Sequence, residues 1–368
     1  MHPLRLVGNG VVVATAVFVL TPFGDWAQAR NAWTASSSWT STVTVIPQPM
    51  QVPAPVRVRA PKRVPAPKPV QAKSRPLKQD ATALIPFETA PFPYNGTVAT
   101  SDKPFWNVEE DGRRGHKTSF GRLYWEDETY SDNRVLMHIP KGFDIRKPAV
   151  MIVFFHGHGA TLRRDVLQRQ RVPDQITASG ANAVLVAPQF ASDASDSSCG
   201  KFWEPGAFGR FVGEAAQQLA RLQGDPRSIR TFASMPIVIM AYSGGYLPAA
   251  WSASKGGLMN RVRGVVLLDA LYGEVDKFAS WIERDRSAFF VSTYLGSTEA
   301  KNTQLEHILT DRYVSYDTAL EPRLQPGSVT IFPGATGSTD VTHRNLVTHA
   351  WCDYPIADIL RRMRQYQR

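Results

Sequence analysis

Short runs of apolar residues without polar alternation recur along the second half of the chain, at residues 150–155, 183–187, 237–241, 265–268, 289–294 and 329–332. Runs of this length are typical of strands that are buried on both faces of a parallel sheet. Helical segments are predicted between or after them, among them residues 163–179, 206–222 and 345–364. This alternation predicts an α/β fold with a mostly parallel central sheet and helices on both faces.

Two earlier segments, residues 120–125 and 134–139, also have the composition of strands. The polar residues 127–133 between them indicate a turn, so we predict that the two segments pair with each other. In a fold of this kind, reactive groups gather at the carboxyl ends of the strands. Catalytic or binding residues are therefore expected where each apolar run ends.

The N-terminal part of the chain differs from the rest in composition. Residues 1–29 carry a basic start, a short apolar run and the sequence Ala27-Gln28-Ala29, which together predict a cleaved export signal. An uncleaved anchor over residues 6–23 is the alternative. Residues 30–80 are first rich in Ser and Thr and then in Pro and basic residues, which predicts an extended linker. The folded domain is expected over residues 81–368, outside the cytoplasm, in the periplasm or secreted.

Most of the formal net charge of +10 belongs to this N-terminal part. Residues 81–368 hold 32 basic and 30 acidic residues, so the predicted domain is close to neutral. A nucleic-acid enzyme usually carries a positive field on its folded domain, and this distribution argues against such a partner. The basic linker either contacts an anionic envelope surface weakly or serves as a solvated spacer.

The chain has two cysteines, Cys199 and Cys352. An oxidising compartment would allow a disulfide, and two separate thiols are the alternative. Nothing in the sequence shows that the two residues meet.

The strongest chemical signal follows the apolar run 237–241, in the sequence Ala241-Tyr242-Ser243-Gly244-Gly245. A buried strand that runs directly into a serine between small residues, with a helix after it, is the setting of a strained nucleophile turn. Ser243 is therefore the predicted nucleophile. A serine-glycine loop that simply ends a strand is the other interpretation.

A glycine-rich loop, His156-Gly157-His158-Gly159, ends the run 150–155. Such a loop brings backbone N–H groups toward a substrate, and we predict an oxyanion hole from the N–H groups of His158 and Gly244. His156 is expected to brace the loop. The other ligands of an H-x-H metal site are missing nearby, so no metal and no cofactor are predicted.

A serine nucleophile needs a base and a carboxylate that orients this base. We predict His343 as the base because it follows the last apolar run in a Gly/Ser/Thr-rich loop; His349 and His307 are the alternatives. Asp269 directly ends the run 265–268 and is the predicted acid, with Glu299 and then Asp340 left open.

Together, the sequences 156–160, 241–245 and His343 resemble the α/β-hydrolase superfamily over residues 150–351. The position of Asp269 is similar to that of the acid in pancreatic-type lipases, whereas most members place the acid one strand later, which keeps Glu299 open. The wider chain resembles exported bacterial hydrolases. The resemblance implies acyl transfer to water through an acyl-enzyme on Ser243, with His343 as base and then acid.

The leading hypothesis is an exported serine esterase that acts on a small-molecule or cell-envelope ester. A cell-wall amidase or peptidase with the same triad, and a non-catalytic binding protein with this fold, are the alternatives. Several aromatic residues lie near the predicted site and either line an acyl or aryl pocket or belong to the core: Phe190, Phe202, Trp203, Tyr242, Tyr246 and Tyr272.

Overall fold

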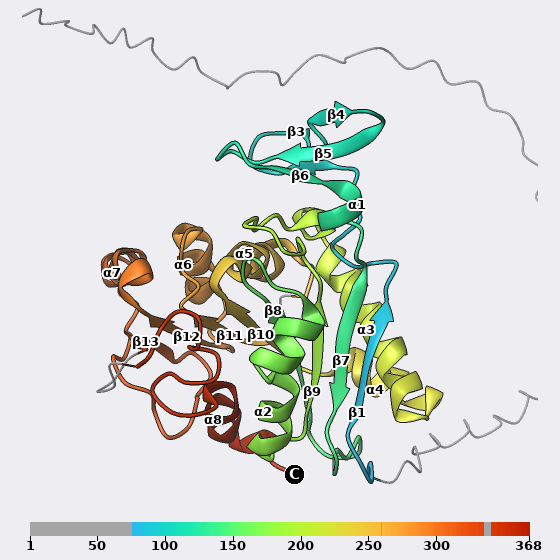
Figure 1. The fold of residues 1–368 in the computed structure, drawn as a ribbon. Coiled ribbons are helices and arrows are strands. Elements are labelled where there is room, and N and C mark those ends of the chain that lie inside the picture. Colours follow the sequence, from blue (N-terminus) through green and yellow to red (C-terminus); the bar gives the residue numbers. More distant parts are fainter. Residues whose placement is uncertain (1–75, 259, 335–339) are drawn as a thin grey trace, which may run out of the picture. The chain divides into compact units, whose positions relative to one another are not determined.

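The computed structural model describes residues 76–258, 260–334 and 340–368 (Figure 1). The predicted export signal and most of the predicted linker, residues 30–75, lie outside the described residues. Within the predicted end of the linker, Leu77 and Asp80 already hydrogen-bond to the loop at residues 141–143. None of the helices in the described ranges has the length and apolar character that crossing a membrane requires.

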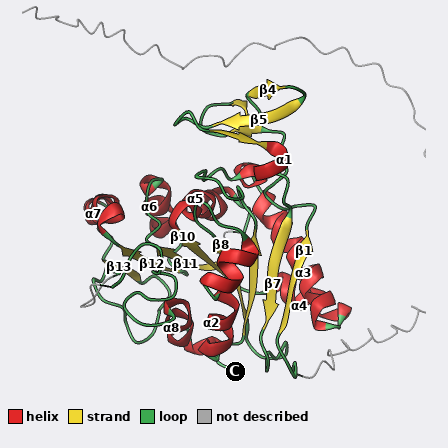
Figure 2. Ribbon diagram, viewed as in Figure 1, coloured by secondary structure: helices red, strands yellow, loops and turns green. Residues whose placement is uncertain are grey.

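The centre of the fold is an eight-stranded sheet, shown in Figure 2 with helices around it. In spatial order its strands are β1 (Ala81–Pro86), β7 (Arg134–Ile139), β9 (Ala183–Pro188), β8 (Val150–Phe155), β10 (Ile237–Tyr242), β11 (Val262–Leu268), β12 (Phe289–Tyr294) and β13 (Val329–Pro333). From β9 to β13 all neighbours are parallel, and β7 alone runs antiparallel to both its partners, β1 and β9. The predicted mostly parallel sheet is confirmed.

Both faces of the sheet are buried, because successive residues of each inner strand point into different cores. In β8, Met151, Val153 and Phe155 pack into one core, and the residues between them pack into the other. One face is covered by α3 (Ala207–Gln223), α4 (Ile229–Ser234), α5 (Tyr246–Lys255), α6 (Val275–Arg284) and α7 (Gly296–Asp311). The other face is covered by the π-helix η1 (Leu162–Arg169), α2 (Val172–Ser179) and α8 (Pro355–Arg362).

Two small sheets lie in the excursion of the chain between β1 and β7. One pairs β2 (Thr97–Val98) with β3 (Lys103–Pro104), and the other consists of β4 (Val108–Glu110), β5 (Arg113–Lys117) and β6 (Leu123–Trp125), followed by α1 (Glu126–Thr129). Figure 1 shows the three-stranded sheet beyond the ends of the central strands, above α5. The remaining elements are four 3₁₀ turns: η2 (Gly200–Trp203), η3 (Pro226–Ser228), η4 (Ser243–Gly245) and η5 (Arg364–Tyr366).

The predicted pairing of residues 120–125 with 134–139 is wrong. Strand β6 pairs with β5, and β7 pairs with β1 and β9 in the central sheet. Five of the six residues of β7 are buried, whereas those of β6 are half-buried. A strand as apolar as β7 needs cover on both faces, which only the central sheet provides.

Two predicted helices differ in the structure: one is divided and the other is shorter. Residues 163–179 divide at Arg171, which has a φ of 52°, and residues 345–364 are helical only from Pro355, after Tyr354 with a φ of 58°. Pro173 and Pro355 occupy the second and the first helical position, where the missing N–H of proline costs no hydrogen bond. Pro355 also disfavours helical backbone at Tyr354, the residue directly before it. His349 therefore lies outside any helix, in an isolated β-bridge with Asp353.

Candidate active site

The carboxyl end of β10 carries Ser243 on a tight turn into α5. Ser243 has a φ of 53°, which is strained for a residue with a side chain by about 1 kcal/mol or more. The turn is tightly surrounded: a Cβ on Gly245 would lie 2.5 Å from the carbonyl oxygen of Phe155, and a Cβ on Gly157 would lie 2.6 Å from the Cβ of Ser243. Only glycine fits at these two positions, and their close contacts hold the serine in its strained conformation.

The structure brings Ser243, His343 and Asp269 into one hydrogen-bonded chain. The Oγ atom of Ser243 lies 2.8 Å from Nε2 of His343, and Nδ1 of His343 lies 2.6 Å from Oδ2 of Asp269. The three residues follow β10, β13 and β11, whose carboxyl ends meet at the same edge of the sheet. Residues separated by up to 100 positions thus form a serine–imidazole–carboxylate chain with the geometry that activation of a serine hydroxyl requires.

Asp269 is fully buried, and its second oxygen is also satisfied. Oδ1 accepts hydrogen bonds from the N–H of Leu295 at 3.0 Å and from the hydroxyl of Thr298. Burial alone raises the pKa of this carboxyl group, but the hydrogen bonds from His343, Thr298 and Leu295 outweigh burial and hold the pKa below its usual range. An ionised Asp269 only accepts hydrogen bonds, so Nδ1 of His343 carries the proton and Nε2 is free to accept one from Ser243.

The loop that carries His343 is fastened to the sheet and to η1. The hydroxyl of Tyr242 donates to the carbonyl oxygen of His343 at 2.7 Å, and the two rings stack with their centroids 5.0 Å apart. Burial raises the pKa of Tyr242 to about 12, so this hydroxyl keeps its proton at neutral pH. Arg169 donates to the carbonyl oxygen of Arg344 at 2.8 Å. These contacts hold the imidazole of His343 beside the nucleophile.

The two predicted oxyanion donors lie next to Ser243. Gly244 is in the first turn of η4, where backbone N–H groups have no partner within the helix. The N–H of His158 donates to no protein acceptor in the described part of the chain. The His158 ring lies against Gly244 and its Nε2 is 2.7 Å from the hydroxyl of Ser197, a partner that the sequence did not reveal. Both N–H groups are thus available to a developing oxyanion.

His156 is buried beneath this loop and braces it. Nδ1 lies 2.8 Å from the carbonyl oxygen of Gly157, and Nε2 accepts the N–H of Phe190 at 2.9 Å. Both ring nitrogens are therefore engaged within the protein. Among the described residues, no group of three His, Cys, Asp or Glu side chains is arranged to hold a metal ion.

The burial of His156 predicts a pH-dependent stability. Burial lowers the pKa of His156 to about 4, so between pH 6.5 and 4 the unfolded imidazole binds a proton that the folded one excludes. The free energy of unfolding should fall by about 3 kcal/mol through this window as the pH falls, on account of this one residue. The test is the free energy of unfolding in urea, measured at pH 7 and at pH 4 for the wild type and a His156→Gln variant. The fall between the two pH values should be smaller in the variant by about 3 kcal/mol. An identical pH dependence in both proteins would contradict the prediction.

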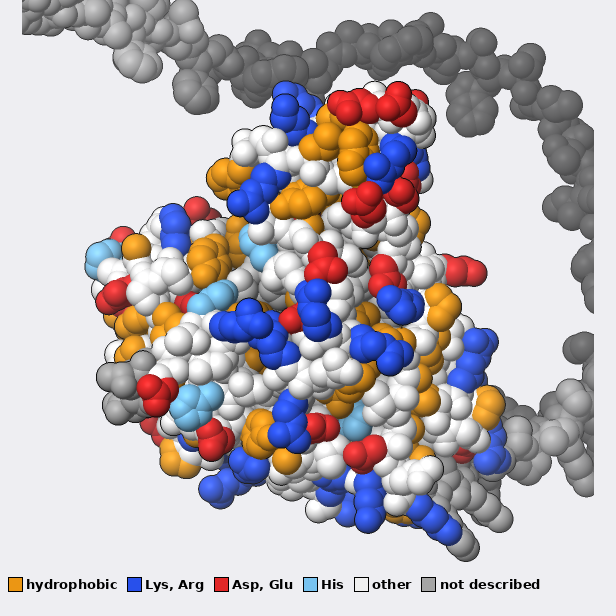
Figure 3. All heavy atoms as spheres, viewed as in Figure 1, with side chains coloured by type: hydrophobic (Ala, Val, Ile, Leu, Met, Phe, Trp, Pro, Cys, Tyr) orange, Lys and Arg blue, Asp and Glu red, His pale blue; other side chains and the backbone are white. Residues whose placement is uncertain are grey.

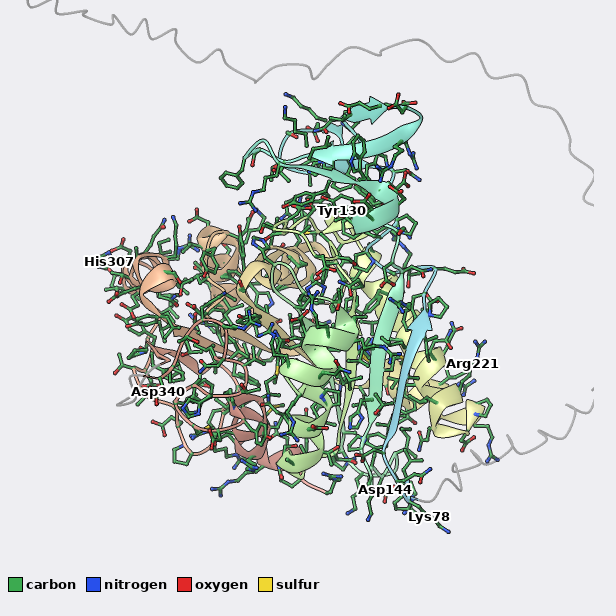
Figure 4. The ribbon with its side chains drawn as sticks, viewed as in Figure 1. Lys78, Tyr130, Asp144, Arg221, His307 and Asp340 are labelled. Atoms are coloured by element: carbon green, nitrogen blue, oxygen red, sulfur yellow. The ribbon has the colours of Figure 1, made fainter. Side chains whose placement is uncertain are left out.

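The alternative candidates lie away from the nucleophile. Glu299 is exposed in the first turn of α7, and His307 is exposed on the same helix, where Figure 4 shows it at the outer surface. His349 pairs with Asp353 at 2.6 Å. Asp340 lies at the exposed beginning of the His343 loop, and the His343 ring bonds to Asp269 instead. Cys199 and Cys352 are both free thiols.

Ser243 opens into a cleft of about 1100 Å³. One wall comes from residues 98–120 of the small sheets, and the opposite wall includes aromatic side chains from the central domain, namely Trp203, Tyr242, Tyr246 and Tyr272. These four of the six aromatic candidates line the cleft, whereas Phe190 and Phe202 pack against each other in the core, with ring centroids 5.9 Å apart. Sequence reasoning missed the first wall entirely, because no motif marks it.

The strand order and the Ser243 turn after the fifth strand of the sheet define an α/β-hydrolase fold. No family model and no curated protein sequence matches the chain. Among solved structures, it is similar to the S954A mutant of a feruloyl esterase module from Clostridium thermocellum, with 14% identity and a TM-score of 0.40 over 74% of this chain and 96% of that one. It is also similar to an S-formylglutathione hydrolase from Agrobacterium tumefaciens, with 9% identity and a TM-score of 0.37 over 66% of this chain and 93% of that one.

Proposed function

We propose that this protein is a serine hydrolase that cleaves carboxylic esters through an acyl-enzyme on Ser243. The observation that carries the proposal is the continuous hydrogen-bonded chain from Ser243 through His343 to the buried Asp269, with distances of 2.8 and 2.6 Å. A serine on a strained turn, hydrogen-bonded to an imidazole and close to two available N–H groups, has the parts that acyl transfer requires.

In the first half of the reaction, Oγ of Ser243 attacks the ester carbonyl carbon while its proton passes to Nε2 of His343. Asp269 stabilises the imidazolium that forms, and the N–H groups of His158 and Gly244 donate to the oxyanion. The tetrahedral intermediate then expels the alcohol, which takes its proton from His343. The acyl group remains on Ser243.

In the second half, a water molecule enters the cleft and gives a proton to His343 as it attacks the acyl-enzyme. The intermediate collapses, Ser243 regains its proton from His343, and the carboxylic acid leaves. His343 gives up each proton that it accepts within the same half-reaction. The reaction therefore balances in atoms and protons with the ester and water alone.

Labelling with a fluorophosphonate tests the proposal directly. We expect one adduct per chain, located on Ser243 by peptide mass spectrometry, and hydrolysis of 4-nitrophenyl acetate that the label abolishes. A Ser234→Ala variant, which changes a surface serine of α4, should label like the wild type. A folded wild-type protein that stays unlabelled and inactive would favour the binding-protein alternative, and faster cleavage of 4-nitroacetanilide would favour the amidase.

A further inference from the structure

The charged side chains that line the cleft are mostly of one sign. Four are cationic, Lys103, Lys117, Arg169 and Arg344, and one is a carboxylate, Asp196. The predicted domain as a whole is close to neutral, with 32 basic and 30 acidic residues at positions 81–368. The positive charge at the cleft is therefore a local feature that the net charge of the domain does not explain.

Most of this charge has no partner within the protein. Arg169 pairs with Asp165 at 2.9 Å, but Lys103, Lys117 and Arg344 form no ion pair with any residue that the structure describes. The single carboxylate of the lining, Asp196, forms no ion pair with these cations in the described part of the chain; it accepts the hydroxyl of Tyr130 at 2.9 Å and two hydrogen bonds from Ser198. Three unpaired cations therefore share the cleft with one carboxylate. Figure 4 shows Tyr130 beside α1, below the three-stranded sheet.

The three unpaired cations come to the cleft from two parts of the chain. Lys103 and Lys117 belong to the small sheets, whereas Arg344 directly follows His343 in the loop of the base. Figure 3 shows Lys and Arg side chains gathered near the middle of this face, beside histidine side chains. A cleft lined by charges of one sign raises the local concentration of a substrate of the opposite sign.

We propose that the ester cleaved at Ser243 carries a negatively charged group, such as a carboxylate, sulfate or phosphate, and that Lys103, Lys117 and Arg344 bind this group. The proposal rests on the serine hydrolase function proposed above. Hydroxyl groups along the same wall, including those of Thr100, Ser101 and Thr118, supply neutral donors to the same oxygens.

The test uses three acetate esters that differ in the charge of the leaving group: 4-acetoxybenzoate, 4-acetoxybenzamide and (4-acetoxyphenyl)trimethylammonium. Each kcat/KM is divided by the rate constant for hydrolysis of the same ester by hydroxide, which removes the difference in leaving-group reactivity. At low salt we expect the anionic ester to be preferred over the neutral one by about tenfold, and the cationic ester to be the poorest. At 0.5 M NaCl the preference should shrink, because the charges are exposed and therefore screened.

Two triple variants, each of which loses three positive charges, test whether the preference for the anionic ester comes from the cleft or from the net charge of the protein. In Lys103→Gln/Lys117→Gln/Arg344→Gln, the preference for the anionic ester over the neutral one should fall toward one. The control, Lys147→Gln/Arg286→Gln/Arg323→Gln, changes exposed residues that precede β8, β12 and β13 at the opposite edge of the sheet, and the preference should persist.

Cleavage of the neutral ester without any preference for the anionic one would overturn the inference and leave the hydrolase function standing. An equal fall in preference in both triple variants would also overturn it, because the effect would then belong to the net charge and not to the cleft. If none of the esters is cleaved and Ser243 stays unlabelled, the hydrolase function itself fails.

Discussion

A Ser243→Ala variant should lose activity on an aryl acetate by a factor on the order of 10⁵–10⁶ in kcat. The reason is that Oγ of Ser243 is the atom that bonds to Nε2 of His343, and the neighbouring serine in the cleft, Ser197, is bonded to His158 instead. Without Oγ, His343 can only assist direct attack by water, which avoids the acyl-enzyme but is far slower. The N–H groups of His158 and Gly244 remain, so substrate binding should change little.

The measurement is kcat from steady-state hydrolysis at saturating substrate, on protein expressed in a host without other esterase activity. Thermal unfolding serves as the control for folding: alanine keeps the backbone strain at position 243 and loses one hydrogen bond, so the free energy of unfolding should fall by no more than about 1.5 kcal/mol. A folded variant that keeps more than a hundredth of the wild-type rate would remove Ser243 from the mechanism.

An Asp269→Asn variant should lose about 10⁴-fold in kcat, the second largest effect. Oδ1 of the asparagine keeps the hydrogen bonds from Leu295 and Thr298, so its amide nitrogen must face His343. An amide N–H donates, and Nδ1 of His343 must then accept, which moves the imidazole proton to Nε2. The base is then protonated at the nitrogen that should take the proton of Ser243.

Glu299→Gln is the matched control for this prediction. Glu299 is exposed on α7, and this variant should keep wild-type activity. The comparison of kcat at pH 8 for the two variants, with circular dichroism to verify folding, decides between the two acids that the sequence left open. Loss of activity in Glu299→Gln with retention in Asp269→Asn would reverse the assignment.

The antiparallel part of the central sheet could not be predicted from the sequence, because β1 is only partly buried and β7 pairs with β1 and β9 instead of β6. The parallel strands from β8 to β13 could be predicted because they are short, mostly apolar and separated by helices. The same is true of the grouping of Ser243, His343 and Asp269: each residue follows a strand of one parallel sheet, so the sheet itself brings them to one edge. In this part of the chain, the position of a residue directly after an apolar run is enough to place it at the carboxyl edge of the sheet. Catalysis by these residues remains a prediction until the variants are measured.

The two small sheets and the cleft wall that they form could not be predicted in the same way. Their strands have two to five residues and mixed burial, so they lack a hydrophobic period. Nothing in the sequence distinguishes Lys103 and Lys117 from other surface lysines. They line the same cleft as Arg344 only because the chain folds back across more than 200 positions. The Ser197–His158 contact is hidden for the same reason.

Strands β1 and β7 are hydrogen-bonded neighbours, so residues 87–133 leave the central sheet and return to it at the same edge. This excursion is anchored by an aromatic cluster, in which the ring of Phe92 lies 4.9 Å from that of Tyr130 and 5.6 Å from that of Phe105. The segment between these anchors could therefore be replaced as a unit. Grafting another loop there should alter which substrates the proposed hydrolase accepts, while the hydrogen-bonded chain of Ser243, His343 and Asp269 stays in place.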